Sequence, residues 1–128
     1  MNPELYKTIR ELMICAEIMI QFEPLEGRQY ETVREIHHWA SFLSNLCENI
    51  SKLEQSDPTP YYRTMDAPFR RILNYVDALL SNSGDGINQN QWYSFQRIRR
   101  LTLCARELAQ SVVAALPGAV DESTAQGG

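Results

Sequence analysis

The sequence lacks the long apolar run that a membrane-spanning helix requires. Its longest strongly apolar stretch, Leu12 to Ile20, is interrupted by Glu17, and a spanning helix needs about 20 consecutive apolar residues. The chain also does not open on a charged segment followed by an apolar run, so we expect no secretory signal. Together these absences predict a cytoplasmic protein that does not bind a membrane.

Residues that carry chemistry are scarce as well. The three cysteines, Cys15, Cys47 and Cys104, are far apart and form no Cys-x-x-Cys pair, so we expect free thiols buried in helices. The two histidines, His37 and His38, are adjacent, so one subunit cannot supply the two Glu-x-x-His motifs of a di-metal helical bundle. We therefore expect no catalytic residue, no cofactor and no metal, and a protein that is not an enzyme.

Helical periodicity is the clearest positive signal. The 128 residues fit one domain, with Asn2 suited to cap the first helix and Pro3 to its first position. The spacing of apolar residues predicts helices over residues 3–22, 28–54, 66–80 and 90–116, with a mobile loop over 81–89. The fold predicted is all-α: an antiparallel four-helix bundle over residues 1–118, dimeric, with a disordered C-terminal tail over 119–128.

Each predicted helix has a face of apolar residues at spacings of three and four. In chain order these expected core faces hold Leu5, Ile9, Leu12, Ala16 and Met19; Val33, Ile36, Ala40, Leu43, Cys47 and Ile50; Phe69, Ile72, Val76 and Leu79; and Phe95, Ile98, Leu101, Ala105, Leu108, Val112 and Leu116. The heptad-like seam from Val33 to Ile50 is the strongest of these patterns.

The first two helices carry more apolar residues than a bundle core consumes. Ile14, Ile18 and Phe22 point away from the core face of the first helix, and Trp39, Phe42 and Leu46 widen the apolar arc of the second. Two explanations stay open: loop or tail residues cover the extra surface, or these six residues form an interface. For an interface, pairing of the Val33–Ile50 seam between two copies is the simplest symmetric route.

The absence of catalytic motifs and the excess apolar surface favour one function. We expect a small non-catalytic protein–protein interaction module, a homodimeric regulator or inhibitor that occludes the surface of another protein. Immunity proteins, anti-activators and phage-encoded inhibitors are analogues at the level of class only. The net charge of −4 is concentrated in acids of the N-terminal half, which would suit a basic partner surface. Whether the apolar surface serves self-association or binding to another protein stays open here.

Two other functions are weighed beside it. The first is a nucleic-acid-associated regulator, since six arginines of the last two predicted helices could contact nucleic acid or an acidic partner. They are Arg70, Arg71, Arg97, Arg99, Arg100 and Arg106. The second is a metal-dependent helical-bundle enzyme centred on Glu31, Glu35 and His38, which share one helical face.

Overall fold

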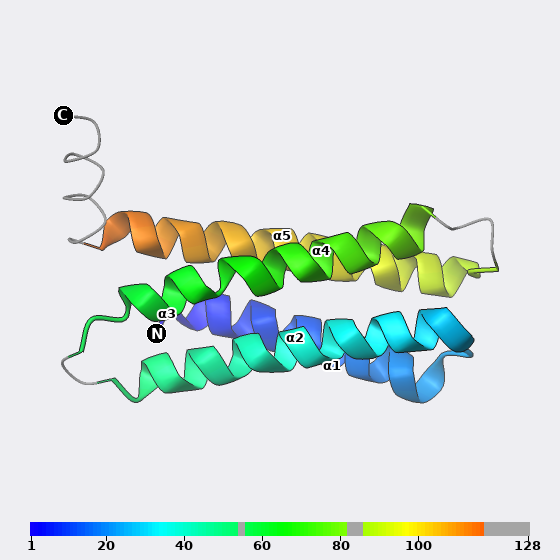
Figure 1. Cartoon of the computed structure of the whole chain (residues 1–128), viewed down its shortest axis with the longest axis horizontal. Helices are drawn as coiled ribbons and strands as arrows, with labels where there is room; N and C mark the ends of the chain where they lie inside the picture. Colours follow the sequence, from blue (N-terminus) through cyan, green and yellow to red (C-terminus); the bar gives the residue numbers. More distant parts are fainter. Residues whose placement is uncertain (54–55, 82–85, 117–128) are drawn as a thin grey trace.

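The computed structural model describes residues 1–53, 56–81 and 86–116, and these residues form helices and no strands. Four helices pack together and a short fifth lies at one end (Figure 1). Their bounds are Pro3–Phe22 (α1), Gly27–Ser51 (α2), Thr59–Thr64 (α3), Asp66–Ser81 (α4) and Gln89–Ala115 (α5). The all-α prediction with four packed helices is confirmed. The predicted disordered tail, residues 119–128, lies outside the described residues, as do residues 82–85 of the predicted mobile loop.

Local capping explains where the helices begin. The Asn2 side chain accepts a hydrogen bond from the backbone N–H of Leu5 at 2.9 Å, as the sequence predicts for the cap of α1. At the start of α5, Asn88 accepts from the N–H of Gln91 at 2.8 Å, and the Gln91 side chain accepts from the N–H of Asn88 at 3.0 Å. This capping box satisfies two backbone donors and fixes the start of α5 at Gln89.

The sequence predicts no helix between residues 54 and 66, but the structure has the short helix α3 there. The Asp57 carboxylate accepts from the N–H of Thr59 at 3.0 Å and from its hydroxyl at 2.6 Å. A proline is tolerated in the first turn of a helix, where its missing N–H has no partner to lose. Pro60 occupies that position, and Tyr62 is buried on the inner side of the short helix.

The four long helices form a closed ring in cross-section. Helix α1 packs against α2 and α5, and α4 packs against the same two helices. The Tyr6 hydroxyl lies 3.2 Å from Glu48, so the start of α1 is beside the end of α2. In Figure 1, α2 and α4 lie in front of α1 and α5. The bundle therefore has an α2–α4 face and, behind it, an α1–α5 face.

The core contains the inner faces that the sequence predicts for α1, α2 and α4, every residue of which is buried. The prediction for α5 is wrong in part, because Leu101, Leu108, Val112 and Leu116 are only half-buried. Thr102 and Ala109 are buried instead, and the Thr102 hydroxyl donates to the Ile98 carbonyl at 2.6 Å. A threonine whose hydroxyl bonds within its own helix leaves no unsatisfied polar group in the core.

None of the described helices is long and apolar enough to cross a membrane.

Candidate protein-interaction surface

Three large apolar side chains of α1 face outward. Ile14 is 43% exposed, Ile18 51% and Phe22 76%. They are spaced four residues apart, and four residues turn an α-helix by about 40° beyond a full circle, so the three side chains form one slightly slanted strip. The opposite face of α1 is the buried core face. We name Ile14, Ile18 and Phe22 the α1 strip.

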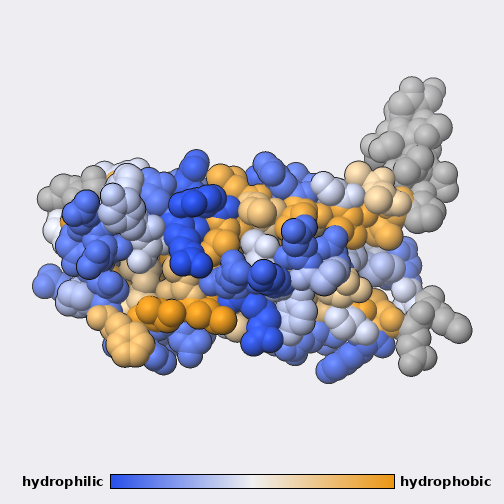
Figure 2. Space-filling view, turned by 180° about the vertical axis from the view of Figure 1, so that it is seen from behind, coloured by the Kyte–Doolittle hydropathy of each residue, from blue (hydrophilic) through white to orange (hydrophobic). Residues whose placement is uncertain are grey.

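Figure 2 shows the α1–α5 face directly. A hydrophobic band runs along the C-terminal half of α1, and a second lies over the C-terminal half of α5, with hydrophilic atoms between them. The half-buried Leu101 lies at the middle of α5, and the half-buried Leu108 and Val112 lie in its C-terminal half. Displacement of these residues from the core therefore adds apolar surface to the same side of the molecule.

Cys15 and Arg97 show which neighbour the α1 strip is turned towards. Cys15 follows Ile14 on α1 and is half-buried. Burial raises the pKa of its thiol, and the charge of Arg97 on α5 opposes part of that rise. Arg97 belongs to α5, and α5 packs against α1, so this flank of α1 is on the α5 side. The three thiols are free as predicted; Cys47 is buried, but the expectation of burial is wrong for the exposed Cys104.

The extra apolar residues of α2 are less exposed than the α1 strip. Leu46 is buried, Trp39 is half-buried and Phe42 is 37% exposed. The Arg71 guanidinium of α4 lies 4.9 Å from the centre of the Trp39 ring, within the range of a cation–π interaction. The Phe42 ring contacts Trp39 edge-on, with ring centres 5.7 Å apart. Helix α4 therefore covers much of this apolar arc.

The six residues proposed from sequence as one interface do not form one surface. Trp39 lies between α2 and α4, whereas the α1 strip is turned towards α5 on the opposite side of the bundle. The symmetric pairing of the Val33–Ile50 seam is also wrong as a route to a dimer. All six seam residues lie in the core of a single chain, none more than 4% exposed, so the seam cannot reach a second copy.

The six candidate nucleic-acid-contacting arginines are mostly engaged within the chain. Arg70 and Arg106 bind the two oxygens of Asp66 at 2.9 and 3.0 Å. Arg99 binds Asp77 at 3.0 Å, and Arg71 covers Trp39 as described. The remaining two, Arg97 and Arg100, have no ion pair with any described residue. The structure thus leaves two arginines, not six, with their charge uncommitted.

A groove of about 660 Å³ between α2 and α4 contains the residues of the metal-enzyme alternative, Glu31, Glu35 and His38. Within the part of the chain that the structure describes, no group of three or more His, Cys, Asp or Glu side chains could hold a metal ion. Trp39 also lines the groove, and its indole N–H is buried without a hydrogen-bond partner. The geometry therefore does not support a metal site at these three residues.

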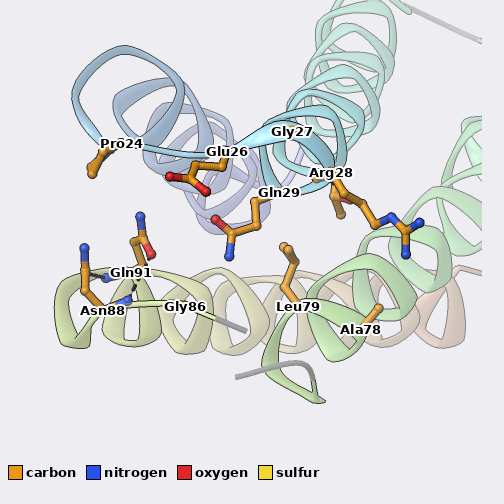
Figure 3. A pocket seen from close by; sticks show the side chains of 11 residues that line it. Pro24, Glu26, Gly27, Arg28, Gln29, Ala78, Leu79, Gly86, Asn88 and Gln91 are labelled. Atoms are coloured by element: carbon orange, nitrogen blue, oxygen red, sulfur yellow. Dashed lines mark hydrogen bonds between the residues drawn. The ribbon is translucent and has the colours of Figure 1, made fainter. Parts of the chain in front are cut away.

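A second cleft, of about 780 Å³, lies at the end of the bundle where α2, α4 and α5 meet (Figure 3). Gln29 of α2 and Gln91 of α5 point into it, and Leu79 of α4 lines its floor. Gln91 is 2% exposed, and its oxygen is already used in the α5 cap. The described residues that line the cleft include no cysteine or histidine that could act as a nucleophile or a base.

Comparison with protein-family models, with curated proteins and with solved structures finds no match to this chain.

Proposed function

We propose that this chain is a small non-catalytic interaction module that functions by placing the α1 strip against another polypeptide. It belongs in the class of regulators and inhibitors that occlude a partner surface, built on an antiparallel bundle. The observation that carries the proposal is the exposure of three large apolar residues in one strip, 76% for Phe22. Contiguous apolar surface of this kind is typical of protein interaction sites.

The free energy gained by burying the α1 strip limits how stable an interface the strip can form by itself. Full burial of a large apolar side chain contributes about 1.5–3 kcal/mol. Since the three side chains are already partly buried, covering them adds roughly 3–5 kcal/mol before the cost of association. That is enough for an anchor but not for a whole stable interface. Polar and charged residues around the strip must therefore contribute to affinity and specificity.

The alternatives have less support from the geometry. Four of the six arginines proposed to contact nucleic acid already bind Asp66, Asp77 or Trp39. A nucleic-acid function would show as tight binding that weakens steeply with salt. For the metal-dependent enzyme, Glu31, Glu35 and His38 form no cluster that could bind the ion.

A photo-crosslinking amino acid in place of Ile18 tests the proposal in cells that make the protein. We expect covalent adducts to one defined polypeptide, which mass spectrometry of the adduct identifies. The matched control places the same amino acid at Asn45, an exposed position of α2 away from the strip, and should give no such adduct. If Ile18 gives no more adduct than Asn45, the α1 strip contacts no polypeptide and the proposal is wrong.

A further inference from the structure

We propose that the cleft at the end of the bundle is a second binding site, which takes an extended peptide segment carrying an acidic side chain. The cleft has a volume of about 780 Å³ and lies where α2, α4 and α5 meet (Figure 3). Its described lining contains no residue of the α1 strip. The inference therefore goes beyond the proposed function, and either of the two can fail without the other.

Gln91 is the buried polar residue of the cleft. It is only 2% exposed, and its side-chain oxygen accepts from the N–H of Asn88. Its side-chain N–H₂ group has no hydrogen bond with any residue that the structure describes. Among the described residues, the buried side-chain atom that is both unpaired and sealed from solvent is the Trp39 nitrogen, so the Gln91 nitrogen still opens onto the cleft. Two unused donors at this position favour a ligand with a carbonyl oxygen.

Gln29 and Glu26 extend this pattern of donors and acceptors. The Gln29 side chain points from α2 towards α5, and Glu26 lies beside it (Figure 3). Neither side chain has a hydrogen bond or an ion pair with a described residue. Gln91 offers donors, Glu26 acceptors and Gln29 both. Because each peptide unit carries one C=O and one N–H, an extended peptide segment can satisfy all three side chains.

The rest of the lining favours a peptide over a nucleotide. Leu79, Ala78 and Pro24 supply aliphatic surface for a side chain of the ligand. None of the described lining residues is aromatic, so a nucleobase would find no ring to stack on. Arg28 is exposed on the side of the cleft away from Pro24 (Figure 3) and has no ion pair with a described residue. Its guanidinium favours an acidic side chain at that end of the peptide.

Selection from a phage library of random dodecapeptides tests the inference on the purified full chain. We expect a family of enriched peptides that share an Asp or a Glu at one position. Calorimetry with the corresponding synthetic peptides then gives their dissociation constants. No enrichment over a surface without the protein overturns the inference.

Gln91→Glu tests whether the selected peptides occupy the cleft. Glutamate keeps an oxygen that accepts from the N–H of Asn88 and suits a capping box as well as glutamine does, but it lacks the two donors. We expect the selected peptides to bind at least about 10-fold more weakly, because a peptide carbonyl loses its donor and faces a carboxylate. The matched control is Gln89→Glu, an exposed residue of the same turn outside the described lining, which should bind as the wild type does.

Arg28→Glu keeps the test valid if circular dichroism shows that Gln91→Glu does not fold. Arg28 is exposed, so the fold should be retained. Peptide binding should weaken about 5-fold, as expected from loss of an exposed ion pair. The control is Arg34→Glu, which makes the same charge change on α2 outside the described lining and should have little effect.

The same variants separate the cleft from the α1 strip. Peptides that bind Gln91→Glu and Arg28→Glu as tightly as the wild type, but no longer bind Ile18→Glu, occupy the α1 strip. That result overturns the inference and leaves the proposed function standing. Adenosine monophosphate serves as the nucleotide probe, followed through the side-chain amide signals of Gln91 in nuclear magnetic resonance spectra. Signals that shift with this nucleotide and with none of the selected peptides also overturn the inference.

Discussion

Helices α1 and α2 carry similar excesses of apolar residues, yet the fold treats the two excesses differently. On α2, Leu46 is buried and Trp39 is half-buried beneath Arg71. On α1, Ile18 and Phe22 remain 51% and 76% exposed. A helix can therefore carry a wider apolar arc than the core of a bundle requires without forming an interface. Whether the extra apolar surface stays exposed depends on whether a neighbouring helix has a side chain long enough to cover it.

The neighbours explain the outcome. Helix α4 presents Arg71 towards α2, and a guanidinium can lie flat on an aromatic ring while its stem covers apolar surface. Helix α5 presents Arg97 towards α1, where its charge acts on Cys15. The α1 strip lies farther round the helix, and its aromatic ring, Phe22, has no cation–π contact with an arginine among the described residues. Exposure of the strip is therefore a property of the α1–α5 pair and not of α1 alone.

The largest expected effect is a difference in the free energy of unfolding between a buried extra apolar residue of α2 and an exposed one of α1. Leu46→Ala should lower the free energy of unfolding by about 2–4 kcal/mol, because it removes buried methyl groups and leaves a cavity. Urea denaturation followed by circular dichroism measures the change. Ile18→Ala, measured in dilute protein, should lower it by less than about 1 kcal/mol. Equal losses in the two variants would mean that Ile18 is as well packed as Leu46, and the contrast between α1 and α2 would be lost.

The cysteine of α2 predicts a pH dependence. Burial, aided by the negative charge of Glu48, raises the pKa of the Cys47 thiol from 9.0 to about 12. Below pH 9 the thiol is protonated in both folded and unfolded chains and has no effect. Between pH 9 and 12 only the unfolded chain loses the proton, so the free energy of unfolding should fall as pH rises.

Urea denaturation at pH 8 and pH 10.5 checks this dependence. Cys47→Ala should make the decline shallower, although other groups that titrate above pH 9 continue to contribute. The control variant, Cys104→Ala, removes an exposed thiol and should follow the wild-type profile. A Cys47→Ala profile that coincides with the wild type would show that burial of this thiol does not couple to folding.

A smaller effect is expected from uncovering Trp39. Arg71→Gln should lower the free energy of unfolding by about 0.5–1 kcal/mol through loss of the cation–π contact. It should also increase quenching of Trp39 fluorescence by acrylamide, measured in a Trp92→Phe chain so that one tryptophan reports. Arg100→Gln serves as control, since no ion pair with a described residue is lost. Unchanged quenching in Arg71→Gln would show that this arginine does not cover the α2 arc.

The smallest effect concerns the contact between the two helices. Tyr6→Phe removes the hydroxyl that lies 3.2 Å from Glu48. Because this hydrogen bond is exposed to solvent, its loss should lower the free energy of unfolding by no more than about 0.5 kcal/mol. Urea denaturation of Tyr6→Phe and of Glu48→Ala, each of which removes one partner of this hydrogen bond, should give similar small values. A loss above 1 kcal/mol would mean that this polar contact, in addition to the apolar core, holds α1 against α2.

The inner faces of α1, α2 and α4 could be predicted from sequence because spacings of three and four repeat there with unambiguous apolar residues. The α5 face could not, since Leu101 and Leu108 compete with Thr102 and Ala109 for the same core positions. Hydropathy favours the leucines, but the register that starts at Gln91 buries the smaller residues. The hydrogen bond from Thr102 to Ile98, which makes this register tolerable, leaves no trace in a hydropathy pattern.

The candidate site divides in the same way. The sequence alone placed Ile14, Ile18 and Phe22 on one strip of a helix, because a helical period determines which side chains share a face. It also determined the cap at Asn2 and the end of α1 at Phe22. Only the tertiary structure decided that Leu46 and Trp39 are covered and that the α1 strip is not. Whether an apolar side chain is covered depends on which helices are its neighbours and on which of their side chains can reach it. Both are determined only when the four helices pack together.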